Sequence, residues 1–181
     1  KLNPKVFADI KFHYVNQKNQ NGLGDAVLHA KELVGDDSFA VLLPDDLFFS
    51  DKSCLSQLID TYEETNSSVI AVNKIDKENI HKYGVISPGI KEYDAILIDD
   101  IVEKPSAEDA PSDIAVCGRY IFTSLIFDYL EATNFDKSGE ILQKIVDEFN
   151  DIMLTDFRIN KTTKIPLLYA LLYCIGVDFN L

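Results

Sequence analysis

Two carboxylates stand directly behind a short apolar run. Residues 41–43 are Val-Leu-Leu, and they lead through Pro44 into Asp45 and Asp46. In α/β proteins, ligands bind beyond the carboxyl ends of the strands, and Mg²⁺ prefers oxygen ligands. The pattern therefore indicates a metal site at Asp45, with Asp46 beside it. The alternatives are a plain surface turn and a short helical turn at Leu47–Phe48 that Asp46 caps.

An acid and a base follow one another farther along the chain. Glu103 and Lys104 end a predicted strand, and Gly84 opens an earlier one. A glutamate can accept hydrogen bonds from two sugar hydroxyls, and a lysine offers a compact positive charge for a phosphate. These types indicate a sugar-phosphate site. The alternative is an exposed ion pair at a strand end, which contributes little to stability.

Glycines stand at the start of a predicted helix. Gly22-Leu23-Gly24 would let the backbone approach a flat base or a phosphate, because glycine has no side-chain wall and helix N-termini favour anions. The alternative is a simple turn. The histidines have no ligand spacing, and no serine or cysteine has a partnered base, so covalent catalysis has no support in the sequence.

The elements that must position these residues alternate between strands and helices. Apolar periodicity predicts strands over 10–15, 39–43 and 67–72 and helices over 23–34 and 55–62, with Gly35 in a left-handed cap. The run 39–43 is continuously apolar, which predicts helices on both of its faces. Shorter strands over 83–87, 95–98, 101–103 and 114–122 and helices over 126–130 and 141–149 follow. We therefore predict an α/β fold with a mixed, mainly parallel sheet and an antiparallel portion.

Composition narrows the function classes. The chain has 181 residues, 46% of them hydrophobic, and a formal charge of −13, which argues against nonspecific binding to nucleic acid or to anionic membranes. Its three cysteines are scattered, as expected in a reducing cytoplasm, and no apolar run is long enough to span a bilayer. We expect a soluble cytoplasmic protein, in which Leu167–Ile175 would suit a subunit contact in a homo-oligomer.

Several segments, taken in order between residues 10 and 123, resemble the bacterial UTP-glucose-1-phosphate uridylyltransferase family. Their order and spacing are more specific than any one of them. They are Gln17 followed by Gly22–Leu28, then Phe39–Asp46, Tyr83–Ile86, Ile101–Pro105 and Ala110–Tyr120.

The resemblance implies a Rossmann-like nucleotidyltransferase fold that makes UDP-glucose and pyrophosphate from UTP and glucose 1-phosphate with Mg²⁺. Carried over by position, it assigns Gln17 and the Gly22 backbone to the uracil, Asp45 to Mg²⁺, Gly84 and Glu103 to the glucose, and Lys104 to the sugar phosphate. Catalysis would rest on Asp45 and Lys104. Asp46 is adjacent and receives no role of its own.

The sequence departs from the family in three places. The glycine-rich N-terminal loop that grips the triphosphate has no counterpart, so the fold is expected to be incomplete there and the chain by itself weakly active or inactive. The family's second metal-binding aspartate, just before a Cys-Gly pair, is replaced in Tyr173–Gly176. A further family segment is divided between Gly139–Leu142 and Ile152–Asp156.

These similarities predict one partial domain over residues 1–181. Residues 10–73 would form a nucleotide- and metal-binding half, 74–160 a sugar-phosphate half, and 161–181 a divergent tail. Two other hypotheses stay open. One is a noncatalytic sugar-nucleotide-binding or oligomerising remnant, and the other is a related sugar-1-phosphate thymidylyltransferase.

Overall fold

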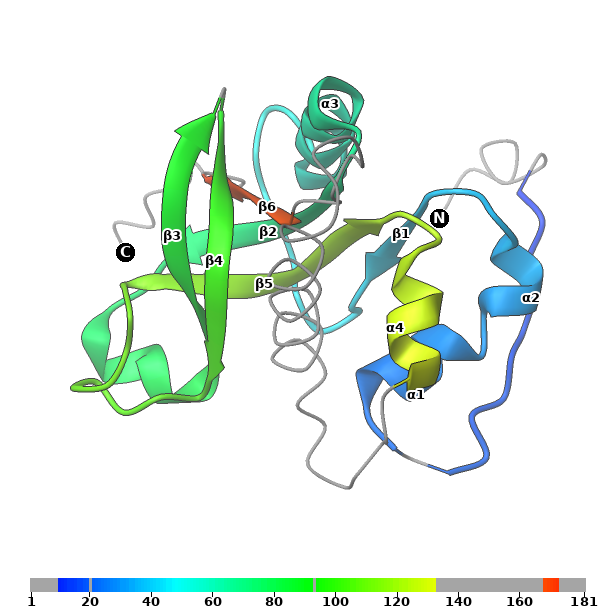
Figure 1. Cartoon of the computed structure of the whole chain (residues 1–181), viewed down its shortest axis with the longest axis horizontal. Helices are drawn as coiled ribbons and strands as arrows, with labels where there is room; N and C mark the ends of the chain where they lie inside the picture. Colours follow the sequence, from blue (N-terminus) through cyan, green and yellow to red (C-terminus); the bar gives the residue numbers. More distant parts are fainter. Residues whose placement is uncertain (1–9, 20, 93, 133–167, 173–181) are drawn as a thin grey trace, which may run out of the picture.

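The computed structural model describes residues 10–19, 21–92, 94–132 and 168–172. The described strands form one sheet in the order β1-β5-β2-β6-β4-β3 (Figure 1). The strands are β1 (Phe39–Leu42), β2 (Ser68–Lys74), β3 (Gly84–Glu92), β4 (Ala95–Glu103), β5 (Ile114–Phe122) and β6 (Leu168–Leu172). The helices are α1 (Leu23–Leu28), α2 (Lys31–Val34), α3 (Cys54–Thr65) and α4 (Ile126–Ala132), with a 3₁₀ helix at Lys77–Lys82.

The sheet is mixed, but the prediction that it is mainly parallel is wrong for the described part. Only β2 and β6 pair in parallel there, and every other described pairing is antiparallel. The reason is the insertion of β5 between β1 and β2. Since β5 is antiparallel to both, β1 and β2 run in the same direction, as the strand-helix-strand pattern predicts, yet they are not neighbours.

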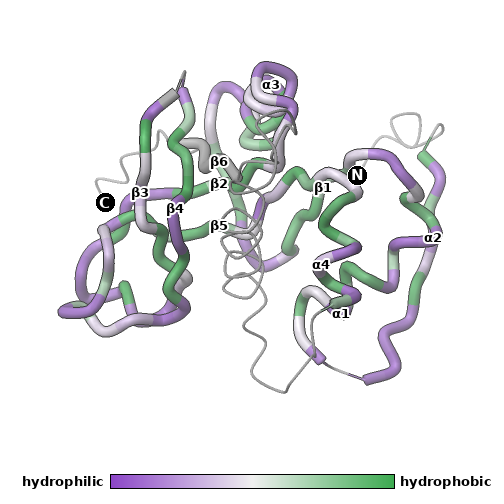
Figure 2. The backbone as a smooth tube through the Cα atoms, viewed as in Figure 1, coloured by the Kyte–Doolittle hydropathy of each residue, from purple (hydrophilic) through white to green (hydrophobic). Residues whose placement is uncertain are grey.

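The strand with two covered faces is β2 rather than β1. In β2, Ile70 and Val72 join a core cluster with α1 and α4, while Val69 and Ala71 join a second cluster under α3. In Figure 2 the hydrophobic colour runs along β2 and β5. The predicted run over residues 39–43 instead ends at Leu42 and alternates between half-buried and exposed positions, because β1 lies at one end of the sheet.

The far end of the sheet curls back onto β5. β3 pairs with β4 along its length, and Val85 of β3 also pairs with Ala115 of β5. The two strands predicted at 95–98 and 101–103 are one strand, β4, and β3 is longer than predicted. In Figure 1 the β3–β4 pair crosses β2 and β5. This crossing brings the start of β3 and the end of β4 next to the start of β5.

The N-terminal predictions are partly wrong. Residues 10–15 form no strand and are exposed, with Tyr14 93% exposed, and no described strand pairs with them. The single helix predicted over 23–34 is two helices, because the Ala30 N–H bonds to the nearer carbonyl of Val27 and tightens the chain into a turn. Gly35 has the expected positive φ of 64°, but with ψ of −132° it does not adopt the predicted left-handed cap conformation.

Helix α3 confirms the helix predicted over 55–62, and its ends extend beyond that range. It begins at the Ser53 cap, whose hydroxyl accepts a hydrogen bond from the Ser56 N–H at 3.1 Å, and ends at Asn66 in the left-handed conformation. β6 pairs on both edges, so the backbone of Leu168–Leu172 is not free for a neighbouring subunit. The predicted helix over 141–149 and the segments 139–142, 152–156 and 173–176 lie outside the described residues.

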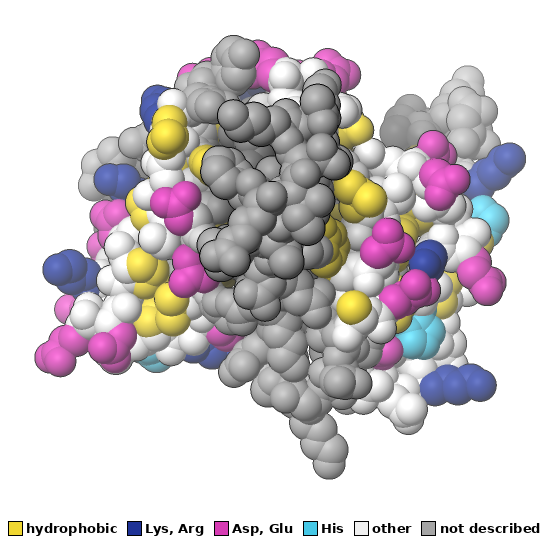
Figure 3. Space-filling model, in the orientation of Figure 1, with side chains coloured by type: hydrophobic (Ala, Val, Ile, Leu, Met, Phe, Trp, Pro, Cys, Tyr) yellow, Lys and Arg dark blue, Asp and Glu magenta, His cyan; other side chains and the backbone are white. Residues whose placement is uncertain are grey.

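The distribution of charge on the surface and the lengths of the helices also bear on function. Acidic side chains occur on both the β3–β4 side and the α1–α4 side of the visible surface, and no single patch gathers them (Figure 3). Within the described residues, no helix has the length and apolar character needed to cross a membrane.

Candidate functional site

The turn that carries Asp45 lies directly on β5. The Asp46 carboxylate accepts a hydrogen bond from the Gly118 N–H at 2.7 Å, and the Leu43 N–H donates to the Gly118 carbonyl at 2.9 Å. No helix follows at Leu47–Ser50, so Asp46 caps none. Asp46 is half-buried by this bond, while Asp45 is exposed. The capping alternative is therefore wrong, whereas the surface-turn alternative agrees with the exposed turn at Pro44 and Asp45. The two carboxylates have different surroundings.

Glycine is the only residue type that fits at position 118, beneath this turn. A Cβ there would lie 2.6 Å from the Asp46 Oδ2 and 2.8 Å from the Leu43 Cβ. Both distances are shorter than real Cβ contacts allow, so any side chain would push the turn away from β5.

The predicted sugar-phosphate residues meet at the paired ends of β3 and β4. Gly84 is opposite Glu103 in the antiparallel register, and a Cβ at Gly84 would lie 3.0 Å from the Glu103 Oε2. The Lys104 Nζ lies 3.3 Å from the Glu103 Oε1. Lys104 has φ of 48°, and its N–H donates to the Tyr83 carbonyl at 3.0 Å. The structure thus brings these three predicted residues together.

One face of β5 connects the two groups. Alternate residues of a strand share a face and are about 7 Å apart. A Cβ at Gly84 would lie 3.8 Å from Val116, and the next residue on that face, Gly118, holds Asp46. Tyr120 follows on the same face. Burial raises the pKa of the Tyr120 phenol, and the negative charges of Asp46, Cys117, Glu103 and Asp45 raise that pKa further.

Asp45, Asp46 and Glu103 all raise the pKa of the same phenol, so the turn that carries Asp45 and the end of β4 both lie near Tyr120. The sequence placed these carboxylates more than fifty residues apart, and only the insertion of β5 shows that they are close.

The predicted base-binding residues form a separate group at the start of α1. The Gln17 Nε2 donates to the Gly22 carbonyl at 3.1 Å and to the Asp25 carboxylate at 2.6 Å. Asp25 is buried, which makes this pairing a fixed feature. Among the described residues no hydrogen bond or ion pair joins this group to Asp45 or Glu103.

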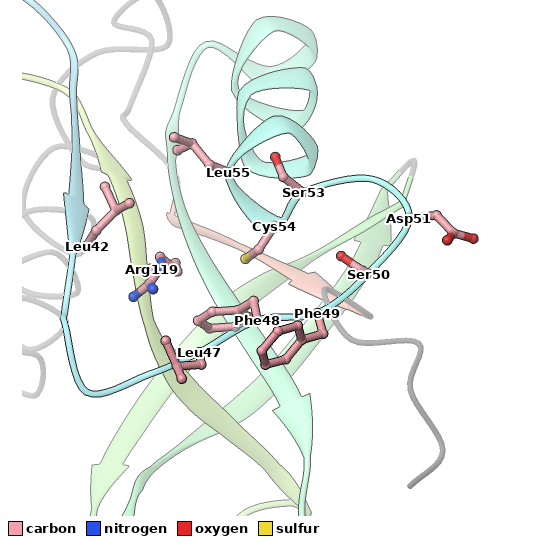
Figure 4. Close-up of a pocket in the computed structure, with 10 residues that line it drawn as sticks. All are labelled: Leu42, Leu47, Phe48, Phe49, Ser50, Asp51, Ser53, Cys54, Leu55 and Arg119. Atoms are coloured by element: carbon pink, nitrogen blue, oxygen red, sulfur yellow. The ribbon is translucent and has the colours of Figure 1, made fainter. Parts of the chain in front are cut away.

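A cavity of about 670 Å³ lies on the other face of β5 (Figure 4). None of the predicted site residues lines it. It is bounded by Leu42, Leu47, Phe48, Phe49, Ser50, Asp51, Ser53, Cys54, Leu55 and Arg119. Arg119 lies within the segment Ala110–Tyr120 that resembles the family, and it received no role of its own from the sequence. Its signal was its place between Gly118 and Tyr120, and its contacts could not be read from spacing.

The carboxylates of Asp45 and Asp46 could hold Mg²⁺ only if a bound substrate supplied further oxygen atoms. No group of three His, Cys, Asp or Glu side chains in the described ranges is arranged to hold a metal ion. Asp45 is an exposed carboxylate, and the Asp46 carboxylate is already bound to the Gly118 N–H. Mg²⁺ is commonly held by one or two carboxylates together with phosphate oxygens of the substrate. Asp45 suits that arrangement.

Cys117 is predicted to be inert near neutral pH. Burial, and then the charges of Asp46 and Cys54, raise the pKa of its thiol to about 12 from 9.0. The folded chain therefore keeps a proton that the unfolded chain loses above pH 9, so the contribution to stability is complete below pH 9 and lost between pH 9 and 12. The raised pKa of Tyr120 likewise makes the free energy of unfolding fall as the pH rises.

We expect the free energy of unfolding to fall between pH 9 and pH 11, and to fall less in Cys117→Ala. Urea unfolding at each pH measures this. An equal slope in the two proteins, or rapid alkylation of folded Cys117 at pH 8, would contradict the assignment.

Comparison with known proteins places the chain. The family model described as nucleotidyl transferase matches residues 3–160. The chain belongs to that family. Within it, the chain is a homologue of UTP-glucose-1-phosphate uridylyltransferases. One such relative, from Staphylococcus epidermidis strain RP62A, is 47% identical over 128 residues, which cover 71% of this chain and 44% of the relative.

Solved structures of this nucleotidyl transferase family agree with the fold. An apo UDP-glucose pyrophosphorylase aligns with a TM-score of 0.78 and 32% identity, covering 93% of this chain and 58% of its own. A UDP-glucose pyrophosphorylase complexed with UDP-glucose aligns with a TM-score of 0.71 and 36% identity, covering 89% of this chain and 57% of its own. The chain thus spans about half the length of the curated relatives it matches.

Proposed function

We propose that this chain carries the sugar-phosphate site and one metal ligand of a Mg²⁺-dependent uridylyltransferase, which converts UTP and glucose 1-phosphate to UDP-glucose and pyrophosphate. The observation that carries the proposal is the grouping of Glu103, Lys104 and Gly84 beside the turn of Asp45. The relatives' names supply the substrates.

The sugar half of the proposal follows from side-chain chemistry. The Glu103 carboxylate would accept hydrogen bonds from two glucose hydroxyls, and glycine at position 84 leaves the space that a sugar ring needs. Lys104 is exposed, and its ammonium would bind the phosphate. The ion pair with Glu103 holds the ammonium beside the sugar-binding carboxylate.

The nucleotide half rests on Gln17. Its amide nitrogen is already bonded to Gly22 and Asp25, which fixes the side chain and leaves its amide oxygen to accept the N–H of uracil. The Gly22 backbone would lie beside the base. We accordingly assign residues 10–73 to nucleotide and metal binding and 74–160 to the sugar phosphate, within one partial domain. A cytoplasmic location fits the scattered cysteines of the sequence.

The chemistry needs charge neutralisation rather than a strong base. The phosphate oxygen of glucose 1-phosphate is already anionic and can attack the α-phosphorus of UTP, releasing pyrophosphate. The protein must align the two anions and offset their charge, which Lys104 and an Asp45-bound Mg²⁺ would do. Asp45 would hold the ion, which would supply positive charge to offset that of the phosphates when bound.

The Asp45 assignment is tested by metal-dependent binding. We expect Mg²⁺ to tighten UDP-glucose binding to this chain, and Asp45→Asn to remove that gain while leaving affinity without Mg²⁺ unchanged. Calorimetry with and without Mg²⁺ measures both. Asp51→Asn is the matched control, since Asp51 is an exposed carboxylate that lines the cavity on the other face of β5. A Mg²⁺ gain that survives in Asp45→Asn would refute the metal role.

A noncatalytic sugar-nucleotide-binding role is the second candidate, because binding UDP-glucose needs only the grouping of Gly84, Glu103 and Lys104 that the described residues contain. It predicts binding of UDP-glucose without turnover. Release of pyrophosphate from UTP and glucose 1-phosphate by this chain would exclude it.

A further inference from the structure

Arg119 makes a set of contacts that the proposed function leaves unused. Its Nη1 donates to the Leu43 carbonyl at 2.6 Å and to the Gly118 carbonyl at 2.7 Å, and its Nη2 donates to the Asp46 carbonyl at 2.6 Å. All of its hydrogen bonds within the described ranges therefore go to main-chain oxygens. A charged guanidinium used in this way fixes backbone geometry.

The two branches of the guanidinium span the metal turn. Leu43 and Asp46 flank Pro44 and Asp45, so one planar group holds the chain on both sides of the exposed carboxylate. The Gly118 N–H holds the Asp46 side chain at the same place. Because the guanidinium is rigid, the spacing of the two carbonyls is fixed, and so is the direction in which the turn presents Asp45.

Arg119 acts from the far side of the strand. Neighbouring residues of a strand point to opposite faces, and Arg119 lines the 670 Å³ cavity on the face opposite Gly118 and Tyr120. Its Cζ lies 4.7 Å from the centre of the Phe48 ring, and Figure 4 shows the two side chains together. The stacking holds the guanidinium in place. It therefore reaches the site through the turn and not by touching a ligand.

We propose that Arg119 is a positioning residue that aims the Asp45 carboxylate at the metal ion. This inference rests on the proposed metal role of Asp45. Lysine at position 119 would keep the charge but could not bridge both carbonyls with one planar group, so the turn would lose one of its two anchors. The loss would appear in metal affinity and not in the metal-independent affinity for UDP-glucose.

The test is a double-mutant cycle on this chain, with Mn²⁺ as a paramagnetic probe and UDP-glucose as the ligand. Mn²⁺ affinity is measured by electron paramagnetic resonance for the parent, Arg119→Lys, Asp45→Asn and the double variant. We expect Arg119→Lys to weaken Mn²⁺ binding about 10-fold. In the Asp45→Asn background the same change should have no effect, because the group through which it acts is gone. Lys74→Gln is the charge control.

Two results would overturn the inference. One is an unchanged Mn²⁺ affinity in Arg119→Lys, and the other is an equal loss in the Asp45→Asn background, which would mean a general structural role. A second readout needs no ligand. Hydrogen exchange of the Leu43 and Gly118 amides should be faster in Arg119→Lys, and unchanged exchange would refute the clamp. If Asp45→Asn alone leaves Mn²⁺ affinity unchanged, the proposed metal function fails, and the metal step of this inference fails with it.

Discussion

Replacing Lys104 with alanine should weaken UDP-glucose binding by about 10- to 100-fold, since a hydrogen bond to a charged group contributes about 1.5–3 kcal/mol. The Lys104 ammonium is exposed and its ion pair with Glu103 is 3.3 Å long, so the folded state loses little when it is removed. The loss should therefore be confined to ligand affinity. Calorimetric titration with UDP-glucose measures it.

The backbone at position 104 allows a matched comparison. Lys104 has φ of 48°, which an alanine side chain tolerates poorly and glycine adopts freely. Lys104→Gly should lose as much UDP-glucose affinity as Lys104→Ala. Its free energy of unfolding should be about 1 kcal/mol higher than that of Lys104→Ala. If the glycine variant instead binds like the parent chain, the ammonium has no role in phosphate binding.

Gly118→Ala should cost about 3 kcal/mol of unfolding free energy. Its new Cβ would lie 2.8 Å from the Leu43 Cβ, which cannot rotate away, and 2.6 Å from the Asp46 Oδ2, which would lose its bond to the Gly118 N–H. Overpacking costs about 1–3 kcal/mol and a lost buried hydrogen bond about 1–3 more. Because the turn must shift, the Mg²⁺ gain in UDP-glucose affinity should disappear as well.

Gly89→Ala is the control for this prediction. A Cβ at Gly89 would meet the carboxylate tip of Asp99 even more closely than the Gly118 contacts, but that side chain is exposed and its tip can turn aside. Its effect on urea unfolding should be under about 1 kcal/mol. Equal losses in the two variants would show that turn geometry at Gly118 is not special.

The fold was predictable where local signals act alone. The amphipathic stripe of α3 predicted this helix, and the structure adds a serine cap at its start and a left-handed residue at its end. The sheet was less predictable, because its strand order depends on where β5 inserts. No periodicity in residues 114–122 indicates that this strand separates β1 from β2. The prediction that both faces of β1 are covered was wrong for the same reason, since a strand at the end of the sheet has only one neighbouring strand.

The site was predictable in residue type and less so in arrangement. Glu103, Lys104 and Gly84 were expected together, and strand pairing places them together. Their closeness to Asp45 depends on the curl of β3 onto β5 through Val85 and Ala115, which the sequence does not indicate. Arg119 escaped notice because its partners are backbone carbonyls, and these carry no side-chain signature.

The most direct test of the central claim is a calorimetric titration of this chain with UDP-glucose, first without and then with Mg²⁺. The grouping of Glu103, Lys104 and Asp45 predicts saturable binding that Mg²⁺ tightens. Absence of saturable binding under both conditions would contradict it, because the sugar-phosphate residues lie within the described fold and need no further segment to meet.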